Sequence, residues 1–156
     1  MALDGRSGYV SVPHEPSLNV GDAFTLEAWV RRGRTGVSQG LLNKGSRSYQ
    51  LYFDAGDRLI LRMAGVDEIT RSTVTLTDRS AFHHVAVAKS GSSVRLYIDG
   101  VDRTGPVANR TLQNTTGNLL IGAGSGFFTG TLDEVAVYDR ALAAAAVARH
   151  HSAGRG

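Results

Sequence analysis

The 156-residue chain contains no cysteine, and it has only three prolines and one tryptophan. The lack of cysteine excludes a disulfide framework, a zinc site with thiolate ligands and a cysteine nucleophile. Long apolar runs are also missing, since none approaches the roughly 18 residues that a membrane-spanning helix needs. The opening segment Met1–Gly5 is neither basic nor strongly apolar, so no signal peptide is expected there. The sequence therefore predicts no membrane span and no thiol chemistry.

A strong excess of charge of one sign is missing as well. The 17 Lys and Arg residues are offset by 14 Asp and Glu residues, which leaves a net charge of +3. The local cluster of cations comprises Arg31, Arg32 and Arg34. Binding of a nucleic acid needs several cations along one track, so no nucleic acid is expected as a partner. Hydrophobic residues make up 42% of the chain, which is typical of a globular protein of one domain.

What the sequence does contain is alternation of apolar and polar residues with a period of two, the pattern of half-buried strands. In the segment 24–31, apolar residues at even positions alternate with mostly polar residues and Trp29 at odd positions. Similar runs occupy residues 49–54, 58–63, 83–88 and 94–99. Asp99-Gly100, which follows the last of them, is the strongest hairpin signal in the chain. Many strands joined by close turns predict an all-β fold, an antiparallel β-sandwich.

One short helix is expected near the C-terminus, where residues 142–150 are rich in alanine. Such a short helix depends on packing rather than on intrinsic propensity. The segment 152–156, SAGRG, is predicted to be a flexible tail or linker because it combines glycine with serine. One domain therefore occupies residues 2–151.

Several segments match known motifs in order. Residues 82–87 read FHHVAV and residues 94–100 read VRLYIDG. Further matches are found at residues 3–5 with 8–13, 24–30, 42–45, 119–122, 128–135 and 138–142. In this order they resemble LamG-like domains, which are laminin G-like jelly rolls of the concanavalin A-like lectin/glucanase type. The family usually has tryptophan where this chain has Phe82. The resemblance implies a jelly-roll β-sandwich that serves as a non-catalytic binding module in a secreted or surface protein.

The sequence contains no recognisable catalytic pattern. A glycosidase needs two carboxylates across one cleft. None of the glutamates heads the Glu-x-Asp-x-Glu pattern of related catalytic jelly rolls. Asp133 and Glu134 are neighbours in a predicted strand, so their side chains are expected to point to opposite faces. The Gly-x-Ser-x-Gly motif of serine hydrolases is also missing. We therefore expect no enzymatic activity.

The resemblance implies a structural calcium ion, since domains of this kind often hold one between their first and last strands. Asp4 in the first loop and Asp133 in a late strand match the acidic positions of the family, so both are candidate ligands. Calcium prefers oxygen ligands, and backbone carbonyls near Gly5, Phe128 or Gly130 could complete its shell. The alternative is that Asp4 forms an Asx-turn and Asp133 bonds to backbone amides.

Candidate ligand-binding residues lie where aromatic and polar side chains share one face of a predicted strand. Sugars are bound by aromatic rings, which cover their C–H patches, and by side chains that hydrogen-bond their hydroxyl groups. The candidates chosen on this ground are Trp29, Tyr52, Arg62, Arg95 and Tyr97. The alternative for Trp29 is a structural role beneath a third element, and the sequence does not reveal which of these strands are adjacent.

These observations together predict a lectin-like, carbohydrate-binding module of a larger secreted or extracellular surface protein. Its partner would be a polysaccharide or glycoconjugate, held weakly because a shallow surface buries little of the ligand. The alternative is a protein-interaction or adhesion module, or an architectural domain that contacts neighbouring domains of its parent. A protein partner would favour an apolar rim, and the candidates for such a rim are residues 37–42 and Phe127–Phe128.

Overall fold

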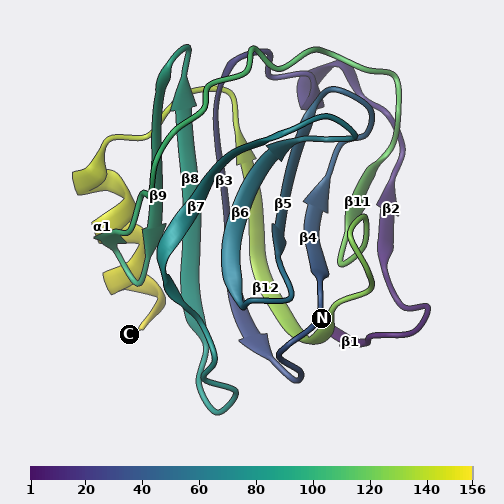
Figure 1. The fold of residues 1–156 in the computed structure, drawn as a ribbon, viewed down its shortest axis with the longest axis vertical. Coiled ribbons are helices and arrows are strands. Elements are labelled where there is room, and N and C mark those ends of the chain that lie inside the picture. Colours follow the sequence, from purple (N-terminus) through teal and green to yellow (C-terminus); the bar gives the residue numbers. More distant parts are fainter. Residues whose placement is uncertain (156) are drawn as a thin grey trace.

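The structure, a computed structural model, describes residues 1–155 as two antiparallel sheets of six strands each (Figure 1). The first, which we name the β3 sheet, has the order β1 (Ala2–Asp4), β12 (Thr129–Tyr138), β3 (Ala23–Arg32), β8 (His83–Ser90), β9 (Ser93–Ile98) and β10 (Val101–Asp102). The second, the β5 sheet, has the order β2 (Val10–Val12), β11 (Leu119–Ile121), β4 (Gln39–Asn43), β5 (Tyr49–Phe53), β6 (Arg58–Met63) and β7 (Glu68–Thr75). A 3-10 helix (Pro16–Leu18) and helix α1 (Ala144–Gly154) complete the chain. The predicted antiparallel β-sandwich with one short C-terminal helix is confirmed.

The hydrophobic core lies between the two sheets, because alternate residues of the central strands point inward. Phe24, Leu26 and Val30 of β3 are completely buried, and so are Leu51 and Phe53 of β5. Full burial of a side chain of this size contributes about 1.5–3 kcal/mol. The remaining residues of these strands point away from the core, and they form the two outer faces on which a functional site can be built.

The first strand of the chain pairs with the last, as the resemblance implied. Ala2 lies opposite Thr131, and Asp4 lies opposite Thr129. Strand β12 continues as the neighbour of β3, and β3 has β8 on its other side. Strand β3 is therefore an interior strand, flanked by partners from the middle and from the end of the sequence.

The hairpin that Asp99-Gly100 predicts is present between β9 and β10. Both residues adopt a positive φ, 52° at Asp99 and 75° at Gly100, as a two-residue turn of type I′ requires. Val101 consequently pairs with Ile98 directly across the turn.

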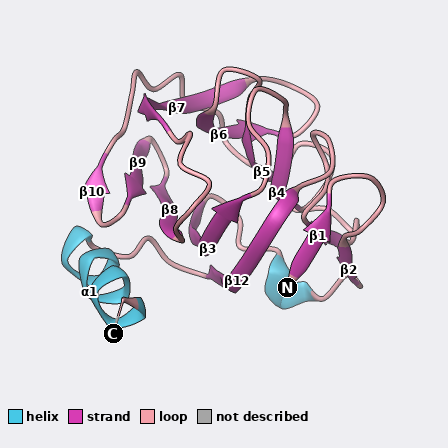
Figure 2. Cartoon of the chain, turned by 90° about the horizontal axis from the view of Figure 1, so that it is seen from below, coloured by secondary structure: helices cyan, strands magenta, loops and turns pink. Residues whose placement is uncertain are grey.

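Helix α1 packs on the outer face of the β3 sheet, where Figure 2 shows it beside the ends of β8, β10 and β12. Val147 is completely buried there, in a cluster with Ala86, Ala88 and Tyr97. Among residues 1–155, no helix is long and apolar enough to cross a membrane.

The bounds of α1 differ from the predicted ones. We expected a helix over residues 142–150, but it begins at Ala144 and ends at Gly154. Residues 152–154 of the expected tail are therefore helical, and Gly156 lies outside the described residues. The extra turn has a packing partner, since the ring of His151 stacks on that of Trp29 with 5.7 Å between the centroids.

Candidate functional site

The five predicted ligand-binding residues lie on two opposite sides of the sandwich. Trp29 on β3 and both Arg95 and Tyr97 on β9 belong to the β3 sheet, whereas Tyr52 on β5 and Arg62 on β6 belong to the β5 sheet. The structure therefore does not bring all five together, and two separate faces have to be considered.

On the β3 sheet, helix α1 covers the aromatic residues. Trp29 is 8% exposed and Tyr97 is 4% exposed, so neither ring offers a free stacking surface. The alternative considered for Trp29, a place beneath a third element, describes its surroundings here. Arg95 is exposed, and its Nε lies 3.6 Å from a carboxylate oxygen of Asp102.

The same covered face contains a hydrogen-bonded cluster around Glu27 that the sequence did not reveal. Its carboxylate accepts hydrogen bonds from the Tyr138 hydroxyl at 2.8 Å and from Nδ1 of His150 at 3.0 Å. Nε2 of His84 lies 3.5 Å from the second carboxylate oxygen. Burial raises the pKa of Glu27, but the hydrogen bonds from His84, His150 and Tyr138 outweigh this and lower the pKa to about 2. The cluster fastens α1 to the sheet.

The expectation that Asp133 and Glu134 point to opposite faces is wrong. The register between β12 and β3 shifts between Asp133 and Ala136, and Glu134 adopts a φ of 46°. A β-bulge of this kind interrupts the alternation of side chains. Both carboxylates are consequently exposed, and both line a hollow beside Trp29 at the C-terminal end of α1.

The two candidate calcium ligands do not form one site. Asp4 is paired with Thr129, so Asp133 lies four residues further along β12, a separation of roughly 13 Å. Oδ1 of Asp4 already accepts backbone N–H bonds from Arg6, Ser7 and Gly8. Within residues 1–155, no group of three or more acidic or histidine side chains is arranged to hold a metal ion. A calcium ion shared by both carboxylates, as the resemblance implied, does not fit this geometry, whereas calcium binding as such stays a prediction.

On the β5 sheet, the structure brings Tyr52 and Arg62 together. Gln50 and Tyr52 point outward from β5, and Arg62 lies directly opposite Gln50 on β6. The guanidinium carbon of Arg62 is 5.8 Å from the centre of the Tyr52 ring, within the range of a cation–π interaction. An aromatic ring and a cation thus share the outer face, beside Gln50, which is only 4% exposed.

Gln50 and Arg62 line a hollow of about 360 Å3 on this face. The other lining residues are Asn43 at the end of β4 and six residues of three turns, which are Gly45, Ser46, Ala64, Gly65, Gly124 and Ser125. One wall depends on Gly40 of β4, since a Cβ there would come within 2.4 Å of the backbone of Ala123. The turn 122–126 can therefore lie against the β5 sheet, where the Ser125 hydroxyl accepts a hydrogen bond of 2.7 Å from the Gln50 amide.

Sequence reasoning missed Asn43, Ser46 and Ser125 because no local pattern shows that the segment 43–46 meets the distant turn at Ser125. From the sequence, Gln50 could be recognised only as a residue that shares a strand face with Tyr52. The sequence did contain a signal for the wall that Gly124 and Ser125 form. The glycines of the segment 122–126, GAGSG, permit a tight turn close to another strand. That signal does not say which strand the turn approaches.

The sequence was also compared with known proteins. A family model described as the concanavalin A-like lectin/glucanase superfamily, of the third laminin G type, matches residues 4–148. The chain belongs to this superfamily. No curated protein matches the sequence. The match covers nearly the whole sandwich, so the LamG-like resemblance is confirmed together with the jelly-roll fold.

Solved structures of this superfamily fold contain similar domains. A protein from Bacteroides ovatus, provisionally described as carbohydrate-binding, superposes with a TM-score of 0.75 at 19% identity, over 90% of this chain and 44% of that one. The binding domain of Paraclostridial Mosquitocidal Protein 1 superposes with a TM-score of 0.74 at 18% identity, over 97% of this chain and 42% of that one. The third structure is domain 4 of an extracellular arabinanase from Geobacillus stearothermophilus, solved with arabinotriose. It superposes with a TM-score of 0.72 at 18% identity, over 95% of this chain and 74% of that one.

These similarities show a shared fold, since all three identities are below 20%. This superfamily member spans less than half the length of the first two structures, 44% and 42%. A domain of this kind is therefore found within longer polypeptides.

Proposed function

We propose that this chain is a non-catalytic module that binds carbohydrate through the hollow on the β5 sheet. The observation that carries the proposal is the grouping of Arg62, which lines the hollow, with the ring of Tyr52 beside it on the outer face. The ring of Tyr52 can cover the C–H patch of a sugar, while the guanidinium of Arg62 can bond to its hydroxyl groups. The size of the hollow suits one or two sugar rings rather than a flat protein surface.

The comparisons support this proposal through the arabinanase domain, which was solved with a bound sugar oligomer, arabinotriose. That domain is part of an extracellular enzyme, and we propose that the present module likewise belongs to a larger secreted or surface protein. The module would hold its parent on a polysaccharide, and attachment of several modules would raise the effective affinity.

A direct test is retention of the purified domain on a panel of insoluble polysaccharides and on a glycan array. We expect retention by at least one polysaccharide, and loss of that retention in the variant Tyr52→Ala. The matched control is Tyr9→Ala, which removes a tyrosine that is 47% exposed at the other edge of the sheet. Retention that survives Tyr52→Ala but fails in Tyr9→Ala would place the site elsewhere. No retention by any glycan would contradict the function.

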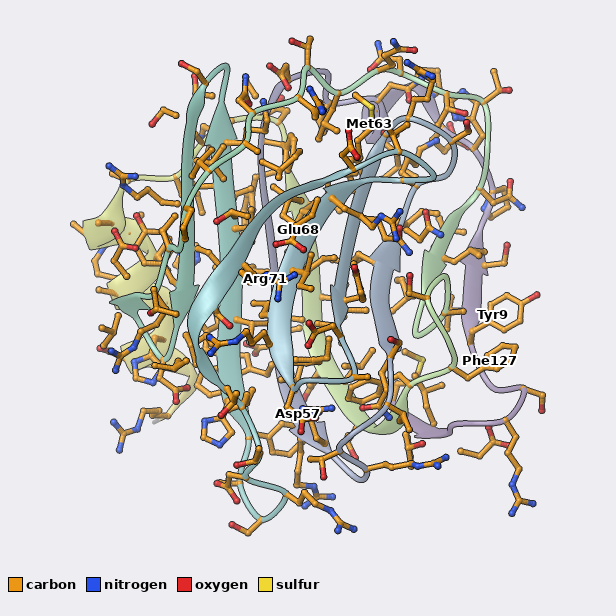
Figure 3. All side chains as sticks on the ribbon, viewed as in Figure 1. Tyr9, Asp57, Met63, Glu68, Arg71 and Phe127 are labelled. Carbon is orange, nitrogen blue, oxygen red and sulfur yellow. The ribbon has the colours of Figure 1, made fainter. Side chains whose placement is uncertain are left out.

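The second candidate function is contact with a protein partner or with a neighbouring domain. The rim that the sequence suggested is only partly available, because Leu41, Leu42 and Phe128 are completely or almost completely buried. What favours this alternative is an exposed aromatic pair, Tyr9 and Phe127, whose ring centroids are 6.0 Å apart and which Figure 3 shows beside β2 and β11. The Tyr9→Ala variant tests this pair as well.

A further inference from the structure

The charge inside the hollow on the β5 sheet has one sign. Of the residues that line it, Arg62 alone is ionisable, and the others carry amides, hydroxyl groups or no polar side chain. No carboxylate within residues 1–155 forms an ion pair with Arg62, although five other arginines of the chain have such partners. Those five are Arg32, Arg71, Arg95, Arg110 and Arg140. A cation in a hollow without a counter-ion favours an anionic ligand.

The carboxylate nearest in register to Arg62 is held elsewhere. Glu68 of β7 lies opposite Arg62 in the pairing of β6 with β7. Both of its oxygens accept hydrogen bonds from Arg71, each at 2.6 Å, and Figure 3 labels the two side chains. A two-point pair of this kind is strong, and it fixes Glu68 away from the hollow. Asp54 adds a second carboxylate to Arg71 at 3.7 Å.

The guanidinium of Arg62 also keeps unused bonding capacity. Its Nε is buried and has no hydrogen-bond partner. A ligand in the open hollow does not reach this buried Nε, so its bonds would go to the two terminal nitrogens of the guanidinium. A planar guanidinium presents donors in a fork that matches the two oxygens of a carboxylate. Tyr52 beside it offers a ring, and the Ser125 hydroxyl, which accepts the bond from Gln50, can donate one to a ligand.

We propose that the hollow binds an acidic sugar, one that carries a carboxylate, with Arg62 as the group that recognises this carboxylate. The proposal rests on the proposed function of the same hollow and narrows its ligand class. Arg62 sets the preference for an acidic over a neutral sugar, and Tyr52 supplies affinity that both kinds of sugar share.

The experiment compares matched pairs of oligosaccharides by isothermal titration calorimetry with the full chain. One pair is α-1,4-linked trigalacturonate and galactotriose, and the other is 3′-sialyllactose and lactose. We expect the acidic member of at least one pair to bind tenfold or more tightly than its neutral partner. We also expect this advantage to shrink when sodium chloride is raised from about 0.05 M to about 0.5 M, because salt screens the attraction.

Three variants assign the effect to Arg62. Arg62→Gln is expected to remove the tenfold preference, because it weakens the binding of the acidic sugar more than that of the neutral one, and Arg62→Lys to restore part of the preference. Arg110→Gln is the matched control, because it removes the same charge from a half-exposed arginine that is paired with Asp67. The control is expected to keep the preference. Circular dichroism of each variant verifies the fold.

Every outcome bears on one of the two proposals. Equal or weaker binding of both acidic members, with neutral binding present, overturns the acidic ligand and leaves carbohydrate binding intact. A preference that persists in Arg62→Gln overturns the role of Arg62. Failure of all four oligosaccharides, together with no retention on any polysaccharide or array glycan, contradicts carbohydrate binding and the acidic preference with it.

Discussion

Nδ1 of His150 donates a hydrogen bond of 3.0 Å to the carboxylate of Glu27, and this bond joins helix α1 to the interior strand β3. The Tyr138 hydroxyl bonds to the same carboxylate from β12. One carboxylate therefore links three elements that are far apart in the sequence. It is only 7% exposed, so it is shielded from competing water.

The pH dependence of stability follows from the lowered pKa of Glu27. Its carboxyl has a pKa of about 2 in the folded chain against an ordinary 4.5. The stabilisation is present above about 4.5 and is lost as the pH falls towards 2. We expect Glu27→Gln to lower the free energy of unfolding by about 2 kcal/mol at pH 7, and we expect this deficit to shrink at pH 3. Urea unfolding at both pH values measures it.

The control for this prediction is Glu15→Gln, at an exposed position before the 3-10 helix. It is expected to change the stability by less than about 0.5 kcal/mol at either pH. A deficit of Glu27→Gln that stays constant from pH 7 to pH 3 would show that the charge of Glu27 is not what stabilises the fold.

His83 provides a second titration that can be followed directly. Its ring lies between Asp99, at 2.7 Å from Nδ1, and Asp78, at 3.0 Å from Nε2. Burial lowers the pKa of His83, but the hydrogen bonds that its ring donates to Asp99 and Asp78 outweigh this and raise the pKa above its ordinary value. This stabilisation is complete below 6.5 and is lost as the pH rises past the raised pKa. We expect an NMR titration of the histidine rings to place His83 above 6.5, and Asp78→Asn to lower its value.

Docking of α1 can be tested through the single tryptophan. Trp29 is covered by the end of α1, and Val147 is the buried anchor of this helix. We expect Val147→Asp to release the helix, because it places an unpaired charge in an apolar site. The emission of Trp29 should then shift to longer wavelengths while the β-sheet signal in circular dichroism is kept. Ala145→Asp puts the same charge on an exposed position of α1 and should leave the emission unchanged. A release in both variants would contradict the specific role of Val147.

Calcium binding stays a prediction, and the geometry makes it specific. Because Asp4 and Asp133 are four residues apart in register, one ion cannot be bound by both. We expect calorimetric titration of the chelated protein to give a heat that is abolished by either Asp4→Asn or Asp133→Asn, and kept in the other variant. Loss of the heat in both variants would speak for a shared ion and against this register. Calcium titration of the wild-type chain that gives no heat of binding would contradict the prediction.

The sequence predicts the sandwich well, because each strand carries its own evidence. In the segment 24–31 the alternation alone defines the buried face, and Asp99-Gly100 defines a turn without help from distant residues. The bulge at Asp133 could not be predicted, since it depends on how β12 fits against β3. The cover over Trp29 and Tyr97 depends on α1, whose docking position a weak, alanine-rich pattern does not determine.

The candidate site was predicted only in part for the same reason. Tyr52 and Arg62 were each recognisable as polar or aromatic residues on the outer side of a strand. Their proximity arises from the pairing of β5 with β6, and the wall at Ser125 arises from a turn some 75 residues away from Gln50. Local patterns identify such residues, whereas the hollow exists only after distant segments have met.

The position of β3 between β8 and β12 has a consequence for folding during translation. The N-terminal third of a nascent chain would emerge with β3 lacking its neighbour from the C-terminal end, since β12 ends at Tyr138. An unpaired, largely apolar strand is a template for association with other chains. Truncated translation products that stop before Thr129 should therefore be bound by chaperones or aggregate, because the β3 sheet is closed only after β12 has been synthesised.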